Sequence, residues 1–198
     1  MLEIINEIDI DILLWLNGNH TPFWDEVMWF ATGKWTWLPF YSLIVALLVW
    51  KFKKQAIPMI LLIALLITIS DQMASGFFKP LVERFRPSHE ESLKDLLYIV
   101  NDYRGGKYGF MSSHAANVFS LAFYLTFVAS SRIRWLPYVL FPWAILVSLS
   151  RVYLGVHYPT DILVPAILSI PIALGVGYLY KICNEYLIKK LGDNYANE

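Results

Sequence analysis

Three separated fragments of the chain carry residues that are suited to binding and transferring a phosphoryl group. Together they supply three permanent cations, two histidines and one carboxylate. This is the set that hydrolysis of a phosphate monoester through a covalent histidine requires. The fragments are Lys79 with Arg86-Pro87, then Ser112-Ser113-His114, then Arg151 with His157 and Asp161.

The three cations are suited to surrounding one phosphate. An arginine presents a planar fork to phosphate oxygens, and a lysine acts as a point charge. Negative charge grows on these oxygens in the transition state, so fixed cations there lower the barrier. We therefore expect Lys79, Arg86 and Arg151 to bind phosphate. The alternative for each residue alone is a basic side chain that extends from a helix end to the membrane surface.

The spacing of His157 and Asp161 predicts a nucleophile and the carboxylate that orients it. Residues four positions apart share one face of a helix. A carboxylate that accepts a hydrogen bond from one ring nitrogen leaves the other nitrogen with a lone pair for attack. The alternative role of Asp161 is to cap the following helix, and one carboxylate can serve both roles.

His114 stands at the start of an apolar segment, where a helix would present free N–H groups to an anion. We expect Ser112 and the backbone of Ser113 to donate hydrogen bonds to the phosphate. His114 is then placed to protonate the leaving oxygen. The simpler alternative is that Ser112 or Ser113 only caps the helix.

The composition places these residues in a membrane protein. Of the 198 residues, 57% are hydrophobic and 16% are charged, whereas soluble domains average about 45–50% and about 25%. The formal net charge is zero, so nothing favours nucleic acid as a partner. The single cysteine, Cys183, excludes an internal disulfide and a cysteine-based zinc site. The sequence predicts an all-α integral-membrane helical bundle that forms a single domain over residues 1–198.

Five apolar segments approach or reach the roughly 20 residues that a membrane-crossing helix takes. Residues 1–34, which precede them, predict two amphipathic helices at the membrane interface. A sixth crossing by residues 12–33 is the alternative, made less favourable by polar residues at 17–20 and 25–26. The sequence thus predicts five to six transmembrane helices. The five predicted spans are residues 35–50, 56–78, 115–131, 135–150 and 162–181.

Alternating crossings bring the three fragments together. The second predicted span ends at Lys79 and the third begins at His114, while the fourth ends at Arg151 and the fifth begins at Asp161. If successive spans alternate in direction, all four ends lie on the same side of the membrane. Hydropathy therefore predicts one composite site built from residues 79–161.

Basic residues indicate which side that is. Eight lie on each side, and leaving out Lys79, Arg86 and Arg151 gives eight on the far side against five on the site side. Because cytoplasmic loops carry an excess of lysine and arginine, the far side is predicted to be cytoplasmic. The far-side residues are Lys51, Lys53, Lys54, Arg132, Arg134, Lys181, Lys189 and Lys190.

The three fragments resemble the signature motifs of the type 2 phosphatidic acid phosphatase superfamily, which also includes vanadium haloperoxidases and glucose-6-phosphatase. Six residues separate Lys79 from Arg86-Pro87, and the third motif runs from Ser150-Arg151 through His157 to Asp161. The family usually has Pro-Ser-Gly-His as its second motif, where this chain has Met111-Ser112-Ser113-His114. Glycine permits a positive φ and close backbone approach, so this departure concerns the geometry of the phosphate pocket.

The resemblance implies a role for each residue. His157 would be the nucleophile that forms a phosphohistidine, Asp161 would orient it, and His114 would be the general acid for the leaving alcohol. Neither a metal nor another cofactor is implied, because the cations do that work. The implied phosphate ligands are Lys79, Arg86, Ser112, the amide of Ser113, and Arg151.

Residues outside the motifs also suggest roles. In the loop of residues 88–110, Arg104 and Lys107 are candidates for contact with a second phosphate or a sugar on a larger lipid head group; a solvated loop is the alternative. Residues 92–100 predict a short amphipathic helix. Asp71 lies within the second predicted span, where a carboxylate needs a partner or a role. Arg84 is expected to pair with its neighbour Glu83.

The leading interpretation is an integral-membrane lipid phosphate phosphatase that removes a terminal phosphate, in a mono- or diester linkage, while the lipid chains stay in the bilayer. Undecaprenyl diphosphate, phosphatidylglycerol phosphate, phosphatidic acid and lipid A all remain open as substrates. The expected location is a bacterial inner membrane with the active site facing the periplasm. The alternatives are a lipid phosphotransferase and a non-catalytic lipid-binding or transport protein of the same fold. The sequence does not indicate the oligomeric state.

Overall fold

The structure, a computed structural model, describes residues 2–196, and their regular elements are helices apart from one isolated bridge between Phe85 and Tyr108. The two predicted N-terminal helices are present, and each predicted span matches a helix to within a few residues at most ends. The helix of the last span is longer than predicted. The helices are α1 (Leu2–Gly18), α2 (Pro22–Thr32), α3 (Leu38–Phe52), α4 (Ala56–Asp71), α5 (Lys79–Val82), α6 (Ser113–Ala129), α7 (Leu136–Tyr153) and α8 (Pro159–Ala196).

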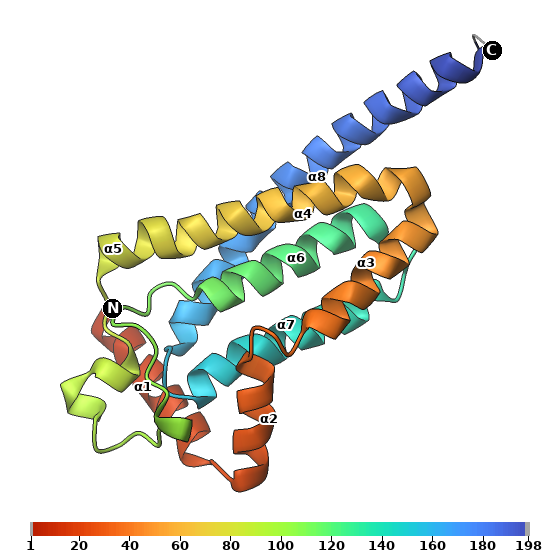
Figure 1. Ribbon diagram of the computed structural model, residues 1–198. Helices are drawn as coiled ribbons and strands as arrows, with labels where there is room; N and C mark the ends of the chain where they lie inside the picture. The colour runs from red at the N-terminus through yellow and green to blue at the C-terminus, as the bar shows by residue number, and fades with distance from the viewer. Residues whose placement is uncertain (1, 197–198) are drawn as a thin grey trace.

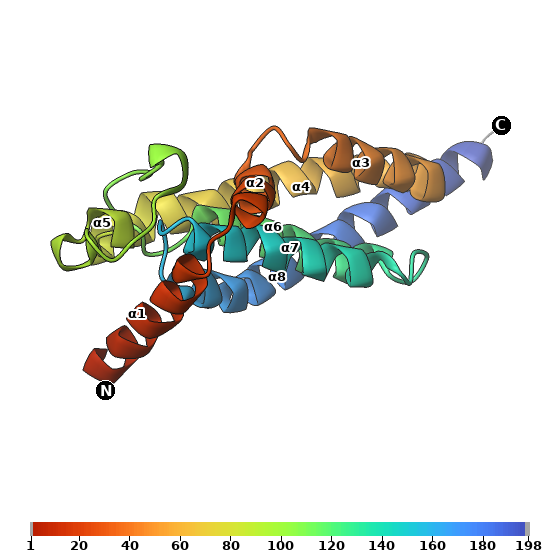
Figure 2. The same cartoon turned by 90° about the horizontal axis from the view of Figure 1, so that it is seen from below.

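The helix α6 is the centre of the bundle. It packs against α4, α7 and α8, and α4 also packs against α8 (Figure 1). The chain reverses between α3 and α4 at the short helix η1 (Lys53–Gln55), where Lys53 has a positive φ of 51°. Viewed from below, α3 and α4 lie along one side of α6, α7 and α8 (Figure 2). Reversals of this kind return the chain to the same end of the bundle after every second helix.

Small and polar residues allow the helices around α6 to approach closely. Ala115, Ala116 and Ala122 of α6 are fully buried, and alanines on a helix face let neighbouring backbones come near. Polar side chains then join the helices in pairs. The hydroxyls of Ser70 and Ser120 lie 2.6 Å apart, between α4 and α6. The Ser169 hydroxyl of α8 donates to the carbonyl oxygen of Ala116 at 3.1 Å.

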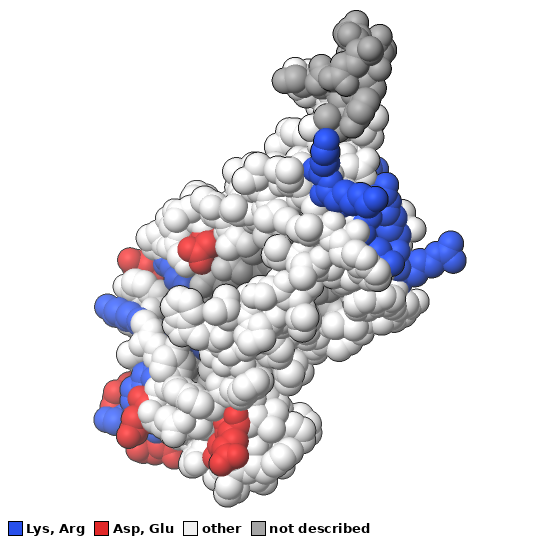
Figure 3. Space-filling model, turned by 45° about the vertical axis from the view of Figure 1, so that its right-hand side comes forward, with Lys and Arg blue, Asp and Glu red and all other residues white. Residues whose placement is uncertain are grey.

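The outer surface of the bundle is apolar in the way that a membrane protein requires. By length and composition, three helical stretches of the described chain are long and apolar enough to cross a membrane: Leu38–Val82, Leu136–Tyr153 and Pro159–Lys189. The first contains the reversal at η1, and α6 is a shorter apolar helix. On the face in Figure 3, a nearly uncharged surface separates a basic end from an end of mixed charge. The predicted integral-membrane helical bundle is confirmed, and the count of five to six spans stays a prediction.

The two N-terminal helices pack against the mixed-charge end. α1 contacts α7 and α8, and α2 contacts α7. Both leave large apolar side chains exposed, among them Trp15 on α1 and Phe23 on α2. Such side chains are suited to the headgroup region of a bilayer, which supports the interfacial position predicted for residues 1–34.

The loop between α5 and α6 differs from the expectation. Residues 92–100 do not form the predicted amphipathic helix. Instead, the loop contains single 3-10 turns, η3 (Pro87–His89), η4 (Glu91–Leu93) and η5 (Val100–Asp102). Ile99 has extended backbone angles, φ −103° and ψ 103°, which are incompatible with a continuous helix to residue 100. The loop is fixed by tertiary contacts rather than by its own helical propensity.

Asn17 at the end of α1 is one such anchor. Its Nδ2 donates to the carbonyl oxygens of Tyr98 and Tyr153 at 2.8 and 2.7 Å. Its Oδ1 accepts from the backbone N–H of Tyr98 at 2.8 Å. With 1% of its surface exposed, this one amide joins α1, the loop and the end of α7.

Replacing Asn17 with alanine is expected to lower the melting temperature of the detergent-solubilised protein and to speed proteolytic cleavage within residues 84–110. Each buried polar group left without a partner costs about 1–3 kcal/mol. The matched control is Asn19→Ala, because Asn19 is exposed and bonds only to the Trp15 carbonyl oxygen within α1. Equal melting temperatures and cleavage rates for the two variants would contradict the anchoring role.

Candidate active site

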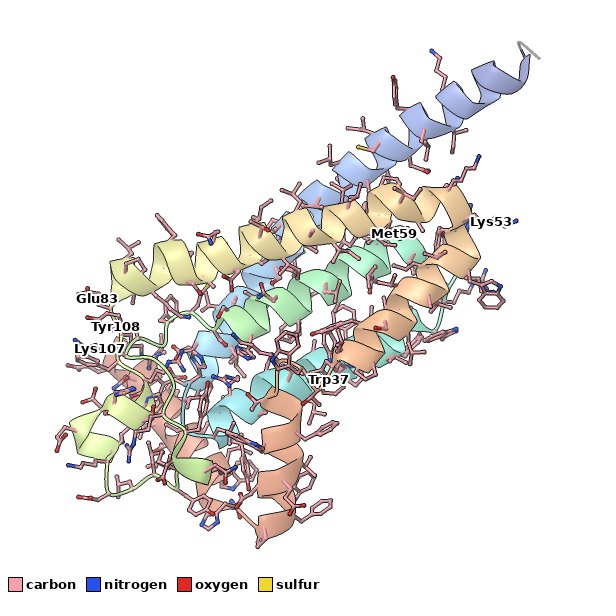
Figure 4. The ribbon with its side chains drawn as sticks, in the orientation of Figure 1. Trp37, Lys53, Met59, Glu83, Lys107 and Tyr108 are labelled. Atoms are coloured by element: carbon pink, nitrogen blue, oxygen red, sulfur yellow. The ribbon has the colours of Figure 1, made fainter. Side chains whose placement is uncertain are left out.

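The structure brings the three sequence fragments to one end of the bundle. Lys79 begins α5, His114 lies in the first turn of α6, and Arg151 lies in the last turn of α7. His157 follows α7, and Asp161 lies in the first turn of α8. Figure 4 marks this end by Glu83, Lys107 and Tyr108, and shows Lys53 at the opposite end. The arrangement follows the one that alternating crossings predict.

His157 and Asp161 form a buried pair at the middle of this region. The His157 Nδ1 lies 3.3 Å from the Asp161 Oδ2. The two residues are 1% and 0% exposed, so neither is in free exchange with bulk water. Because Nδ1 faces the carboxylate, the other ring nitrogen is left for a substrate.

The carboxylate of Asp161 is held at both oxygens. Its Oδ2 also accepts from the backbone N–H of Tyr158 at 3.0 Å. Its Oδ1 accepts from the Arg84 Nη1 at 3.1 Å. The expected pairing of Arg84 with Glu83 is therefore wrong. Glu83 ends its helix in the left-handed region, with φ 50° and ψ 26°, and the Arg84 side chain turns into the protein.

Arg84 connects this carboxylate to α1. Its Nη2 lies 2.8 Å from the Oδ2 of Asp9, a carboxylate that is only 2% exposed. Asp9 also accepts from the backbone N–H of Thr160 at 2.9 Å and from the Thr160 hydroxyl. The Arg84 guanidinium lies over the Tyr158 ring, 3.8 Å from its centroid. One arginine thus links two buried carboxylates from the two ends of the chain.

Arg86 and Arg151 are buried cations with donor atoms to spare. The Arg86 Nε donates to the carbonyl oxygen of Tyr108 at 3.1 Å. Arg151 donates to the Thr32 hydroxyl and, at 3.2 Å, to the Tyr103 hydroxyl. Among the described residues, Arg86 Nη1 and Arg151 Nε are buried nitrogens without a hydrogen-bond partner. Buried donors normally have partners, so these two point to an anionic ligand.

Lys79 approaches the site after a change in helix type. The segment η2 (Gln72–Phe78) is a π-helix that directly precedes α5. A π-helical turn holds more residues than an α-helical turn and often occurs at functional sites. The Lys79 Nζ donates to the Ser75 hydroxyl at 3.3 Å. The electrostatic field of Lys79 reaches both Arg86 and His157.

The second fragment forms the N-terminus of α6. Ser112 is fully buried, and its hydroxyl oxygen accepts from the Ala115 backbone N–H at 3.4 Å. Its own N–H donates to the carbonyl oxygen of Asp161 at 2.9 Å, which ties α6 to α8. Ser113 is not among the residues with positive φ. A serine therefore fits this position without backbone strain, although the family usually has glycine there.

Glycines bring the loop close to the site. Gly105 has a φ of +68°, and a Cβ atom there would lie 2.0 Å from the Arg86 Nη1. Beside it, Arg104 donates to the Ser88 carbonyl oxygen at 3.1 Å. The Lys107 Nζ lies 5.2 Å from the ring centroid of Tyr108. Arg104 and Lys107 are both exposed on this loop, next to Arg86.

Two cavities meet at His114. One, of about 510 Å³, runs between α3, α4 and α6, and its lining includes Ser113, His114, Asn117 and Asp71. The other, of about 550 Å³, lies against α2, and its lining includes His114, Arg151, Tyr103 and Lys34. His114 therefore faces open space on both sides.

Burial and positive charge keep the His157 ring neutral. Burial lowers the pKa of the His157 imidazole well below its usual value, and the charges of Arg151, Arg86 and Lys79 lower it further. Burial also lowers the pKa of Arg86, with a further contribution from Arg151. The pKa of the Tyr103 hydroxyl is raised by burial, but Arg151 and Arg86 outweigh this effect and bring it below its usual value. Arginine charges contribute to all three shifts, which indicates an electropositive pocket.

The protein is an all-helical membrane bundle, and the ends of its helices form an electropositive pocket that contains histidines. These features define a class of membrane-embedded enzyme that acts on anionic groups. The model of the PAP2 superfamily matches residues 60–184, which include all three fragments. The chain therefore belongs to the PAP2 superfamily. The resemblance seen in the motifs is confirmed, and with it the prediction of a phosphatase.

Relatives of known function are close in sequence. A lipid A 4'-phosphatase of Bacteroides thetaiotaomicron is 46% identical over 171 residues, covering 85% of this chain and 75% of the relative. A lipid A 4'-phosphatase of Porphyromonas gingivalis is 37% identical over 183 residues, covering 91% of this chain and 75% of the relative. Both are bacterial lipid phosphatases, and the expected function of a membrane lipid phosphatase is confirmed at that level.

Two solved structures share the fold. A PAP2-type phosphatidylglycerolphosphate phosphatase from Bacillus subtilis superposes with a TM-score of 0.66 and 23% identity, covering 92% of this chain and 87% of that one. LpxE from Aquifex aeolicus superposes with a TM-score of 0.60 and 22% identity, covering 84% of this chain and 93% of that one. At this identity the two structures show a common fold.

Sequence reasoning missed several residues around the site, above all Asp9 and Arg84. A signal for Asp9 was present in the spacing of α1. Asp9, Leu13 and Asn17 follow one another at intervals of four positions, and among the α1 residues whose burial is described they are the buried ones. A carboxylate on the buried stripe of a helix implies a buried cation as its partner. No comparable pattern marks Thr32 or Tyr103, which reach Arg151 only through the tertiary fold.

The depressed pKa of His157 predicts a ring that stays neutral at pH 6.5 and below, where an exposed histidine is half protonated. Nitrogen NMR of histidine-labelled protein in detergent would show this, with His157→Gln identifying the signals. The unfolded chain takes up this proton near pH 6.5 and the folded chain does not, so stability falls as the pH drops below that value. A His157 ring that is half protonated at or above pH 6.5 would contradict the electrostatic account.

The link from Asp9 through Arg84 to Asp161 predicts that Arg84 positions the carboxylate without touching the substrate. Arg84→Lys is expected to lower kcat by about 10²-fold, because a lysine cannot bridge two carboxylates and small displacements of catalytic groups are costly. KM should change little. Asp9→Asn should lower kcat in the same direction, whereas Asp11→Asn, on the exposed face of α1, is the matched control.

The measurement is the initial rate of phosphate release at varied lipid phosphate concentration, with melting temperatures recorded in parallel. A purely structural role would lower the melting temperature of the Arg84→Lys protein while its folded fraction kept the wild-type kcat. That result would reject Arg84 as a positioning residue.

Proposed function

We propose that this chain hydrolyses a phosphate monoester on lipid A, and that it does so through a phosphohistidine formed at His157. The observation that carries the mechanism is the buried contact between His157 and Asp161, surrounded by cations with free donor atoms. The observation that carries the substrate is the 46% identity to a lipid A 4'-phosphatase over 85% of the chain. The test compares lipid A with the other three lipids that the sequence left open as substrates.

In the first step, the ring nitrogen of His157 that does not face Asp161 attacks phosphorus, and the bond from phosphorus to the sugar oxygen breaks. Asp161 stabilises the positive charge that develops on the imidazole. His114 gives its proton to the leaving oxygen, so the alcohol departs neutral. Lys79, Arg86 and Arg151 hold the phosphoryl oxygens, with Ser112 and the amide of Ser113 at the N-terminus of α6.

In the second step, water attacks the phosphohistidine. His114, which lost its proton in the first step, accepts one from the water, and the bond from phosphorus to His157 breaks. Inorganic phosphate leaves, and the enzyme returns to its starting state. The three cations supply the charge stabilisation that a metal ion supplies in other phosphatases, so no step needs a metal.

Arg104 and Lys107 are proposed to contact the sugar part of the head group or a second phosphate. Both are exposed on the loop that carries Gly105 against Arg86. A head group bound at Arg86 would therefore extend toward them. If Arg104→Ala with Lys107→Ala leaves the relative rates on monophosphate and diphosphate lipids unchanged, this assignment fails.

The location follows from the charge pattern and the substrate. The basic end of the bundle contains Lys53 and is opposite the site (Figures 3 and 4). Under the positive-inside rule the basic end is cytoplasmic, and the site faces the periplasmic side of a bacterial inner membrane. We propose that residues 1–198 act as one membrane-embedded domain and that the lipid substrate is the partner they bind.

The test is phosphate release by the detergent-purified protein in the presence of EDTA. The substrates are lipid A, phosphatidic acid, phosphatidylglycerol phosphate and undecaprenyl diphosphate. We expect lipid A to be hydrolysed with the highest kcat/KM. His157→Gln should abolish release, since it removes the nucleophile while keeping a side chain of similar size. His20→Gln, an exposed histidine outside the site, is the matched control.

Radiolabelled lipid A should also leave an acid-labile label on wild-type protein and none on His157→Gln. Phosphate that appears on an added alcohol instead of in solution would indicate a phosphotransferase. A well-folded wild-type protein that releases no phosphate from any of the four lipids would reject the proposal.

A further inference from the structure

The cavity between α3, α4 and α6 is a continuation of the active site into the membrane part of the bundle. Ser113 and His114 line the end of it that meets the phosphate-binding residues. A second cavity, of about 330 Å³, adjoins it and shares Ile67, Val118, Tyr41 and Asn117 with it. The lining of this second cavity is otherwise aliphatic or aromatic. An open, apolar groove of this kind, continuous with a phosphate site, fits the hydrocarbon chain of a lipid whose head group is at His114.

Several polar side chains line the first cavity, and two of them, Asp71 and Asn117, lie where it meets the apolar part of the groove or close to it. Asp71, the last residue of α4, and Asn117 of α6 both line this cavity and contact each other. The Asn117 Nδ2 donates to the Asp71 Oδ1 at 3.5 Å, a long hydrogen bond. Asn117 follows His114 by three residues, and so lies about 4.5 Å further along the helix axis.

The pair has acceptor capacity left over. Because the Asn117 amide turns its Nδ2 toward the carboxylate, its Oδ1 points elsewhere, and among the described residues this oxygen is buried without a partner. The remaining carboxylate oxygen of Asp71 is also an acceptor. In a membrane segment, polar groups of this kind are costly unless they bind something. A hydrogen-bond donor on a ligand would give one of these acceptors a partner.

We propose that Asp71 and Asn117 form a subsite that binds the hydroxyl group of a β-hydroxyacyl chain on the lipid substrate. The inference rests on the proposed function, and it identifies the kind of lipid that the same active site selects. Prenyl chains and the acyl chains of ordinary glycerophospholipids carry no donor at this depth. A β-hydroxyl lies near the start of its chain, so it reaches a point one helical turn from His114 when the phosphate is bound there.

The subsite selects between the two kinds of acyl chain because only a hydroxylated chain can donate a hydrogen bond to it. A hydroxylated chain donates to one acceptor of the pair, whereas a plain chain leaves that acceptor without a partner against hydrocarbon. Leaving a buried acceptor unsatisfied costs about 1–3 kcal/mol, so we expect about tenfold lower kcat/KM for a plain chain. Discrimination of this kind needs no change in the catalytic residues.

The experiment compares two synthetic glucosamine-4-phosphate lipids that differ only in their acyl chains, which are β-hydroxytetradecanoyl in one and tetradecanoyl in the other. The purified wild-type protein is assayed for phosphate release from each in the same detergent. We expect the ratio of kcat/KM, hydroxylated over plain, to be about ten. This ratio is measured on the unaltered protein, so it does not depend on whether a variant folds.

Variants then locate the effect. Asn117→Leu and Asp71→Leu replace each polar side chain with an apolar one of similar size, and each should lower the ratio toward one. Ser42→Ala is the matched control, because Ser42 is a polar residue on an exposed face of α3 that bonds only to the Leu38 carbonyl oxygen. It should keep the wild-type ratio.

The outcomes separate the two proposals. Hydrolysis of both lipids at equal kcat/KM by the wild-type protein overturns the subsite and leaves the proposed function standing. An unequal ratio that both leucine variants retain also overturns it, because the selection then lies elsewhere. If the protein hydrolyses neither synthetic lipid and does not hydrolyse lipid A, both the proposed function and the subsite are overturned.

Discussion

The buried carboxylate of Asp161 is the constraint around which this end of the molecule is built. A carboxylate without exposed surface must be compensated by donors, because the protein interior does not solvate it. Here the donors are the Tyr158 backbone N–H, His157 and Arg84, and Arg84 also donates to Asp9 of the N-terminal helix. The backbone oxygen of Asp161 also receives the N–H of Ser112. Asp161 thus connects α8 to α6 and the loop and, through Arg84, to α1.

The helix α6 has two roles, because most of its length packs the bundle and its first turn forms part of the site. Along most of its length it is a packing element, with alanines and serines that let three neighbours come near. Its first turn carries Ser113 and His114 and presents free backbone N–H groups to the pocket. Because the packing is close, the orientation of this first turn is fixed by contacts far from it. Close packing in the membrane part therefore helps to hold the phosphate pocket in one geometry.

The fold and the centre of the site were predictable because their signals are local. Apolar length identifies the spans, and the spacing from His157 to Asp161 is a short-range pattern. Arg84 was assigned to Glu83 because adjacent opposite charges are the simplest local pairing, yet its partners lie 75 and 77 positions away. The predicted helix over residues 92–100 failed for a similar reason. Its conformation is fixed by Asn17, 81 positions earlier, and not by its own periodicity.

The contact between Asp9 and Thr160 spans 151 positions, and this separation has a consequence for biosynthesis. Residue 9 leaves the ribosome well before its partner, which appears only after α7 is complete and α8 has begun. Until then the N-terminal helix lacks the contacts that it makes with α8, and the carboxylate of Asp161 has not been synthesised. A nascent or truncated chain therefore cannot display a finished pocket to the lipids around it. We therefore expect activity only after α8 has entered the membrane and α1 has docked onto it.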